Sequence, residues 1–200
     1  MSGRRLIDIL VAGAGLSMMA LPMTAIAVLI LSVDGRPILF RQVRSGWRAR
    51  RFVVVKFRTM NGACDGDGRL LPDGQRMTLV GRALRATRLD ELPQLWNVLV
   101  GDMSLIGPRP LLPETIADAG AAGWSRGRIR PGLTGWAQVN GNTLLSDGDK
   151  IALDNWYITH RSLGLDLQIV ARTLLVSLLG ERRDAAAIGR AHARSPHRRG

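Results

Sequence analysis

The stretch from Arg85 to Pro110 has the sequence RATRLDELPQLWNVLVGDMSLIGPRP, and the interpretation of the whole chain starts from it. Apolar residues recur there at helical spacing, which predicts a short amphipathic helix over Pro93–Leu99. Proline suits the first turn of a helix, and Gly101 is typical of the residue that ends one. Asp90 and Glu91 therefore lie immediately before a helix N-terminus.

Adjacent acids at a helix start often only complement the helix dipole, and that interpretation would be preferred for an isolated Asp-Glu pair. Here basic residues surround the pair: Arg82, Arg85, Arg88 and Arg109. Two carboxylates among arginines suit a phosphorylated substrate together with a divalent metal ion. One carboxylate would attack phosphorus, and the other would hold Mg²⁺, which prefers oxygen ligands.

Two segments of this stretch, Leu89–Leu95 and Gly101–Pro110, closely resemble the bacterial sugar transferases. These are the monotopic phosphoglycosyl transferases that begin the assembly of exopolysaccharides, O-antigens and glycoprotein glycans. Lys56–Met60 and Arg130–Gly141 are similar to two further signatures of the family. The chain departs from the family pattern at Asn142-Thr143, where many members have Arg-Asn. The resemblance covers nearly the whole chain, from about residue 4 to residue 179.

The resemblance implies transfer of a sugar-1-phosphate from a UDP-sugar to polyprenyl phosphate, with release of UMP, at the cytoplasmic face of a bacterial inner membrane. It implies that Asp90 is the nucleophile of an aspartyl-phosphosugar intermediate and that Glu91 helps to hold the cofactor Mg²⁺. Lys56 and Arg58 share one face of a predicted strand, and alone they would be interpreted as a solvated face. The similarity of Lys56–Met60 to the family signature favours phosphate binding instead, since two cations together suit a diphosphate. The expected phosphate-binding residues are Lys56, Arg58, Arg85 and Arg109.

Composition is consistent with this class of protein. The 200 residues suit one globular domain with an appended segment, and 46% of them are hydrophobic. A formal net charge of +12, from 28 Lys and Arg against 16 Asp and Glu, suits an anionic membrane surface, nucleic acid or phosphorylated substrates. Cys64 is the only cysteine, which excludes an intrachain disulfide and any multi-cysteine metal site.

The segment Ile9–Val33 carries no charge and is long enough to span a bilayer. Basic residues flank both of its ends, against the usual asymmetry of a spanning helix, and Pro22 lies near its middle. These features favour a helix-break-helix that returns to the cytoplasmic face, although a kinked spanning helix also satisfies them. The resemblance implies a re-entrant hairpin, in which the Thr24 hydroxyl would satisfy a freed carbonyl.

The predicted fold class is α/β (α+β): a re-entrant membrane hairpin over residues 1–34 and a small cytoplasmic domain over residues 35–180. That domain would contain a β-hairpin (38–43 and 52–60), a surface loop (61–75) and helices over 78–89, 112–123 and 150–157. The largely apolar segment 165–179 is expected to be a helix that packs on the core or lies in the membrane interface. The basic segment 181–200 is expected to be disordered.

Two other functions stay open on the sequence. A nucleic-acid-binding protein would explain the positive charge but not the apolar N-terminal run, so no nucleic-acid partner is expected. A catalytically silent membrane scaffold of a polysaccharide assembly complex would explain the membrane segment. It would not explain why Asp90, Glu91 and the surrounding cations are all present.

Overall fold

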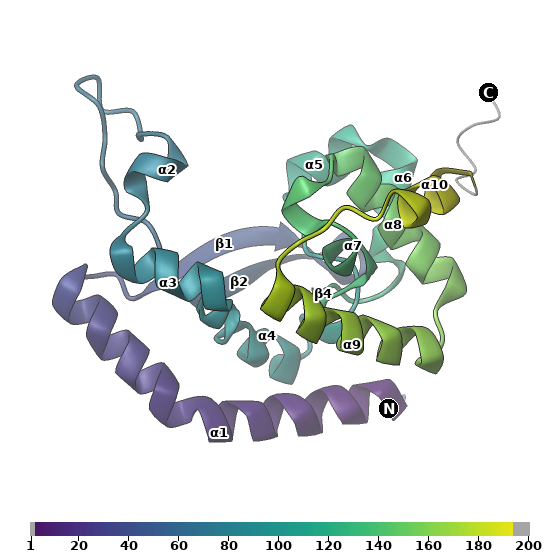
Figure 1. The fold of residues 1–200 in the computed structure, drawn as a ribbon, viewed down its shortest axis with the longest axis horizontal. Coiled ribbons are helices and arrows are strands. Elements are labelled where there is room, and N and C mark those ends of the chain that lie inside the picture. Colours follow the sequence, from purple (N-terminus) through teal and green to yellow (C-terminus); the bar gives the residue numbers. More distant parts are fainter. Residues whose placement is uncertain (1–2, 194–200) are drawn as a thin grey trace.

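The computed structural model describes residues 3–193, and its first element is a single long helix, α1 (Gly3–Val33). Pro22 lies inside this helix, and the helix bends as it passes beneath the rest of the molecule (Figure 1). The Thr24 hydroxyl donates to the carbonyl of Ala20 at 2.9 Å, and such bonds favour bending. Pro22 deprives the carbonyl of Met18 of its amide donor, so Thr24 does not bind the freed carbonyl as expected. The expected interruption at Pro22 is wrong, because the helix continues through it with a bend.

Both ends of α1 are attached to the same globular body. Near its start, Arg5 donates to the carbonyls of Val98 and Leu99 at 2.6 and 2.7 Å. Just after its end, Asp34 accepts a hydrogen bond from Thr78 at 3.0 Å. Between these attachments α1 is largely exposed and apolar, and among the described residues it is the one helix long and apolar enough to cross a membrane.

The predicted β-hairpin is confirmed. Strands β1 (Leu39–Ser45) and β2 (Arg51–Phe57) pair antiparallel around a short 3-10 turn, η1 (Trp47–Ala49). Val54 of β2 packs with Val98 and Met103 into a core that also includes Ala12 of α1. This packing holds β2, the strand that carries Lys56, against the helix that follows the acidic pair.

The loop after β2 extends away from the body (Figure 1) and includes the short helix α2 (Asp73–Arg76). The chain then enters α3 (Leu79–Thr87), whose start is capped by the Thr78 hydroxyl accepting from the amide of Gly81 at 2.9 Å. A Cβ at Gly81 would lie 1.9 Å from the carbonyl oxygen of Thr59, so glycine is required there. This close approach fixes α3 against the end of β2.

The acidic pair lies in a 3-10 turn, η2 (Leu89–Glu91), and the predicted helix follows as α4 (Gln94–Val100). Arg88 begins the turn in the left-handed conformation, with a φ of 57°. Gly101 ends α4 with a φ of 103°, as its predicted role as a helix stop requires. The helix prediction for this stretch is therefore confirmed.

A second sheet was not predicted. Strands β3 (Ser104–Ile106) and β4 (Gly132–Thr134) are only three residues each and pair in parallel. A Cβ at Gly135 would lie 2.0 Å from the carbonyl oxygen of Gly107, so the two backbone segments approach closely there. The close approach that Gly135 permits is therefore between two segments of the protein itself.

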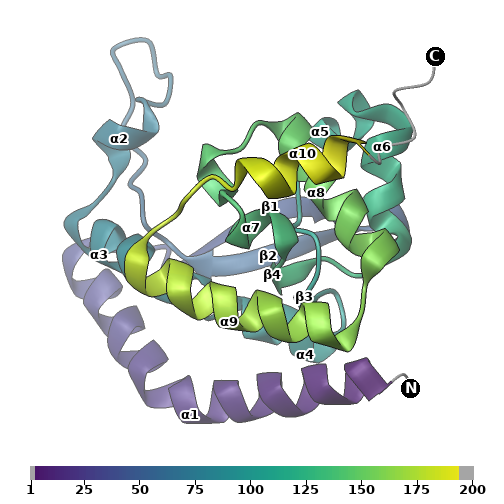
Figure 2. The same ribbon diagram turned by 45° about the vertical axis from the view of Figure 1, so that its right-hand side comes forward.

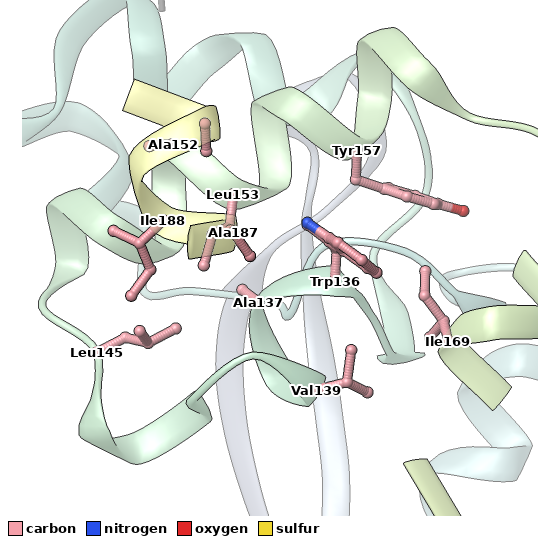
Figure 3. Packing of buried hydrophobic residues seen from close by; sticks show 11 residues of the cluster. Trp136, Ala137, Val139, Leu145, Ala152, Leu153, Tyr157, Ile169, Ala187 and Ile188 are labelled. Carbon is pink, nitrogen blue, oxygen red and sulfur yellow. The ribbon is translucent and has the colours of Figure 1, made fainter. Parts of the chain in front are cut away.

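The rest of the domain is helical: α5 (Pro113–Asp118), α6 (Gly120–Ser125), η3 (Arg126–Arg128), α7 (Trp136–Val139), η4 (Asn142–Leu144), α8 (Asp147–His160) and α9 (Leu163–Leu179). Figure 3 shows the core that joins α7, α8 and α9, with Trp136 of α7 close to Tyr157 of α8 and Ile169 of α9. Trp136 is only 4% exposed and is therefore part of this core.

The predicted disorder of the C-terminal segment is wrong for the residues that the structure describes. Residues 185–193 form α10 (Ala185–Ala193), which packs on α8 through Ala187 and Ile188 (Figures 2 and 3). Asp149 of α8 accepts hydrogen bonds from Arg183 and His192, which fasten both ends of this segment. Residues 194–200 lie outside the described part of the chain.

Candidate functional site

The two acids occupy different environments although they are neighbours in sequence. The turn η2 directs Asp90 inward, where it is 6% exposed, while Glu91 is half-buried. The left-handed Arg88 allows the chain to leave α3 and reverse into this turn. A buried carboxylate of this kind is costly unless cations compensate it.

Three cations approach Asp90 from three separate elements. Lys56 comes from β2, Arg85 from α3 and Arg109 from the loop after β3, and each stabilises the charge on Asp90 electrostatically. The structure therefore gathers Lys56, Arg85, Arg109 and the acidic pair in one place. In the sequence, the loop 61–75 separates Lys56 from Arg85, and α4 and β3 separate Glu91 from Arg109, so their proximity is a property of the fold.

Opposing effects determine the pKa of Asp90. Burial raises the pKa of the Asp90 carboxyl, and the neighbouring charge of Glu91 raises it further. Lys56, Arg85 and Arg109 lower it, but they do not fully compensate, so the pKa remains above its ordinary value. Burial likewise lowers the pKa of Lys56, which the carboxylate of Asp90 opposes. Perturbed, mutually coupled groups of this kind are common at catalytic sites.

Glu91 is held by an ion pair. Its Oε1 accepts a hydrogen bond from Arg109 at 2.7 Å, and among the described residues its Oε2 has no hydrogen-bond donor. Burial opposes the charge on Arg109, but the charge and hydrogen bond of Glu91 outweigh it and raise the pKa of Arg109. One side of the Glu91 carboxylate thus remains available to a ligand.

The residues present fit Mg²⁺ only in combination with a substrate. No group of three or more His, Cys, Asp or Glu side chains capable of holding a metal occurs in residues 3–193. Mg²⁺ is commonly bound by one or two carboxylates together with substrate phosphates and water. Glu91, with one unoccupied oxygen beside Asp90, supplies the protein's share of such a site.

The position of Arg109 depends on a buried ion pair that sequence reasoning missed. Arg126, only 5% exposed, donates to Asp154 from both Nε and Nη2, at 3.0 and 2.6 Å. The same Nη2 donates to the main-chain carbonyl of Arg109 at 2.6 Å. Arg126 therefore ties the loop that carries Arg109 to α8, and it is a positioning residue for the ion pair with Glu91.

Arg58 is the one predicted site residue that the structure does not bring to the acidic pair. Its guanidinium donates to the carbonyls of Asp34, Gly35 and Arg36, at the end of α1. Arg58 follows the last residue of β2, Phe57, so the strand alternation that would place it beside Lys56 no longer applies to it. Arg85, by contrast, is oriented toward the site by its hydrogen bond to the Thr59 hydroxyl at 3.1 Å.

A third arginine near the acids was also not assigned. Arg88 forms an ion pair with Glu181 at 3.0 Å, across 93 residues of sequence. Glu181 also accepts hydrogen bonds from the side chain of Asn142 and from the amide and hydroxyl of Thr143. Burial opposes ionisation of Glu181, but these bonds prevail and lower its pKa. The two residues that depart from the family pattern, Asn142 and Thr143, thus anchor a carboxylate beside the site.

Comparisons with known proteins agree with the resemblance. The model of the family described as bacterial sugar transferase matches residues 1–180. An uncharacterized sugar transferase, EpsL, from Bacillus subtilis (strain 168) is 46% identical over 156 residues, covering 78% of this chain and 77% of that protein. The UDP-glucose:undecaprenyl-phosphate glucose-1-phosphate transferase of Caulobacter vibrioides is 41% identical over 192 residues, covering 86% and 68%.

Other relatives are longer proteins. The undecaprenyl-phosphate glucose phosphotransferase of Komagataeibacter xylinus is 39% identical over 168 residues, which are 76% of this chain but only 32% of that protein. The shared part in each comparison includes most of the fold described above. With a family model that matches from residue 1 to residue 180, this chain belongs to the bacterial sugar transferase family.

Proposed function

We propose that this protein is a phosphoglycosyl transferase that moves a sugar-1-phosphate from a UDP-sugar to polyprenyl phosphate and releases UMP, as a first membrane step of exopolysaccharide or other glycan synthesis. The observation that carries the proposal is the buried Asp90 beside Glu91, with Lys56, Arg85 and Arg109 around it. The relatives named above as undecaprenyl-phosphate sugar phosphotransferases support the same reaction class.

In the first half-reaction, an oxygen of the Asp90 carboxylate attacks the phosphorus that carries the sugar. A bond forms between Asp90 and this phosphorus, and the bond from phosphorus to the bridging oxygen breaks, so that UMP leaves with the electron pair. Lys56, Arg85 and Arg109 bind the diphosphate and stabilise the charge that develops during transfer. The low exposure of Asp90 excludes water from the intermediate.

In the second half-reaction, an oxygen of the polyprenyl phosphate attacks the same phosphorus. The bond to Asp90 breaks and regenerates the carboxylate, and the product is a polyprenyl diphosphate sugar. Glu91, held by Arg109, is the residue that would bind Mg²⁺ together with the substrate phosphates. When bound, this ion neutralises diphosphate charge and stabilises the departing UMP.

The membrane arrangement is part of the proposal. Because Arg5 at one end of α1 and Asp34 after the other both contact the same domain, we infer that α1 enters the membrane and returns to the cytoplasmic face. Its bend and its exposed apolar surface are consistent with that course. The acceptor phosphate stays at the membrane surface, so a site held there would reach it.

The experiment that tests the proposed function measures the first half-reaction alone. Purified protein given a UDP-sugar labelled in the sugar, without lipid acceptor, should retain label covalently and release UMP in equal amounts. Asp90→Asn should abolish both. Because burial raises the pKa of Asp90, its charged form costs folding free energy above that pKa, so Asp90→Asn should melt no lower than the wild type.

Each alternative predicts a different result. Direct attack by polyprenyl phosphate in a ternary complex predicts no labelled protein and intersecting rather than parallel initial-rate plots. A catalytically silent scaffold predicts no UMP release with any donor in a panel of UDP-sugars. Either result with well-folded protein would overturn the covalent mechanism, and the second would also overturn the enzymatic function.

A further inference from the structure

A large apolar cavity opens next to the acidic pair. It has a volume of about 600 Å³, and its lining includes Glu91 and Arg88. The walls come from the N-terminal half of α1, from α4, from the short parallel sheet and from α9. In both ribbon views α9 runs alongside this half of α1 (Figures 1 and 2). The volume lies in the usual range for ligand sites.

We propose that this cavity binds the isoprenoid segment next to the phosphate of the lipid acceptor, and that Arg88 binds the acceptor phosphate where the cavity meets Glu91. The proposal rests on the proposed function and adds the location of its second substrate. It assigns a role to Arg88 and to the inner face of α9 that the catalytic cluster does not require.

The walls have the chemistry that an isoprenoid chain requires. On α1, Ile7 and Val11 are 52% and 49% exposed, and on α9, Leu163 and Leu167 are 66% and 71% exposed. Apolar surface left open to water is unfavourable by about 25 cal/mol per Å², so an apolar occupant would be stabilised there. The floor is formed by residues next to the site, such as Leu92 and Leu105.

The two ends of the cavity differ, which gives the lipid a direction. Ser177, near the end of α9, lines the cavity three residues before Gly180, and Glu181 then pairs with Arg88. At the start of α9, Asp166 pairs with Arg4 of α1 at 2.9 Å. The cavity therefore follows most of α9, from the first turn to the acidic pair. A phosphate at Arg88 would place its lipid along α9, toward the exposed surface of α1.

Arg88 is suited to a phosphate that arrives after UMP has left. It begins the turn that carries Asp90, whereas the main cations that lower the pKa of Asp90 are Lys56, Arg85 and Arg109. Its guanidinium forms an ion pair with Glu181, and both side chains are partly exposed, at 29% and 22%. A phosphate dianion would compete with this single carboxylate for the guanidinium.

Filling the cavity tests the proposal. Val170→Trp places a bulky ring into the lining, while Ala171→Trp adds the same ring on α9 outside it. We expect Val170→Trp to raise the KM for polyprenyl phosphate by about tenfold or more, equivalent to about 1.4 kcal/mol. Acceptor-independent labelling of Asp90 and release of UMP should stay at wild-type rates in both variants, and Ala171→Trp should keep the wild-type KM.

The charge is tested separately. Arg88→Asn removes the guanidinium while asparagine tolerates the left-handed backbone, so the turn should keep its shape. It should raise the KM for polyprenyl phosphate without changing the rate of the first half-reaction. If the wild type forms the adduct but either variant keeps the wild-type dependence on acceptor, the cavity or Arg88 is not the acceptor site. If the wild type forms no adduct, the proposed function itself fails.

A photoreactive acceptor distinguishes the lipid substrate from ordinary phospholipid. A polyprenyl phosphate with a diazirine in its first isoprene unit should label residues 163–177 of α9, and unlabelled polyprenyl phosphate should prevent this. Protection by an equal excess of phosphatidylglycerol would show a general lipid site instead. Labelling confined to the outer surface of α1 would overturn the assignment.

Discussion

Asp8 of α1 accepts hydrogen bonds from the hydroxyl of Ser104 at 3.0 and 2.9 Å, although 96 residues separate the two in the chain. Asp8 also accepts from the amide of Leu105 at 2.9 Å and is only 6% exposed. An acid at the start of an apolar helix therefore connects that helix to β3. The membrane segment and the sheet next to the site share one buried polar contact.

Asp8→Ala should destabilise the protein because it leaves the donors of Ser104 and Leu105 buried without an acceptor. We expect a loss of about 1–3 kcal/mol in the free energy of unfolding, measured by thermal unfolding in detergent. Asp8→Asn retains an acceptor oxygen and is the matched control, which should lose less. Equal stability of the two variants would show that this contact does not hold α1.

The inferred course of α1 predicts that both of its ends face the cytoplasm. With Cys64 replaced by serine, cysteines introduced at Gly3 and at Arg36 should both resist an impermeant thiol reagent in intact cells and react after the cells are opened. Leu21→Cys, on a side chain 80% exposed in the apolar part, should resist in both conditions because lipid covers it. Labelling of Gly3→Cys alone in intact cells would establish a spanning helix.

The raised pKa of Asp90 predicts a pH dependence. The nucleophile must be ionised, so the rate of adduct formation should fall as the pH drops through this pKa, above the usual range of an aspartate. Lys56 lowers this pKa, so Lys56→Gln should move the acid limb to higher pH as well as slow the reaction. Lys150→Gln, which removes a lysine paired with Asp147 on α8, should leave the limb in place.

Glu91 should be distinguished from Asp90 by its response to Mg²⁺. Glu91→Gln supplies a poorer ligand, so the concentration of Mg²⁺ required for half-maximal adduct formation should rise, and high Mg²⁺ should restore part of the rate. Asp90→Asn should recover nothing at any concentration. A metal dependence unchanged in Glu91→Gln would leave Glu91 only the role of holding Arg109.

If Arg88 binds the acceptor phosphate, Glu181 should compete with that phosphate for the guanidinium. Glu181→Gln weakens the ion pair at 3.0 Å and frees the guanidinium, so the KM for polyprenyl phosphate should fall. The amide oxygen can still accept from the amide and hydroxyl of Thr143, which bind one oxygen of Glu181, and this should preserve the course of the chain between α9 and α10. A raised KM with unchanged thermal stability would contradict competition between Glu181 and the acceptor phosphate.

The helices and strands that were predicted correctly are those with a clear local sequence pattern. The α4 segment, with its glycine stop, and the β1–β2 hairpin follow from periodicity and turn residues, which act over a few positions. The parallel β3–β4 pair was missed because three-residue strands carry too short a pattern. The disorder expected of the tail was wrong because basic composition does not reveal that Asp149 binds Arg183 and His192.

The sequence predicted the charged residues of the candidate site but not the residues that position them. Motif resemblance identified Asp90 and Arg109, but the Arg126–Asp154 pair that positions Arg109 has no local signature. Arg58 was misplaced by its proximity in sequence to Lys56, whereas the carbonyls at the end of α1 bind its guanidinium. Contacts between distant residues decide such cases, and they become visible only once the chain is folded.

The attachment of α1 through Asp8 has a consequence for biogenesis. A growing chain exposes α1 first, but the partners of Asp8 do not exist until Ser104 and Leu105 have been synthesised. Until then the carboxylate has to remain hydrated or protonated at the edge of the bilayer. The contact between α1 and the domain therefore forms late, after the nascent domain has formed β3. Insertion of α1 into lipid and folding of the domain are then completed together rather than in succession.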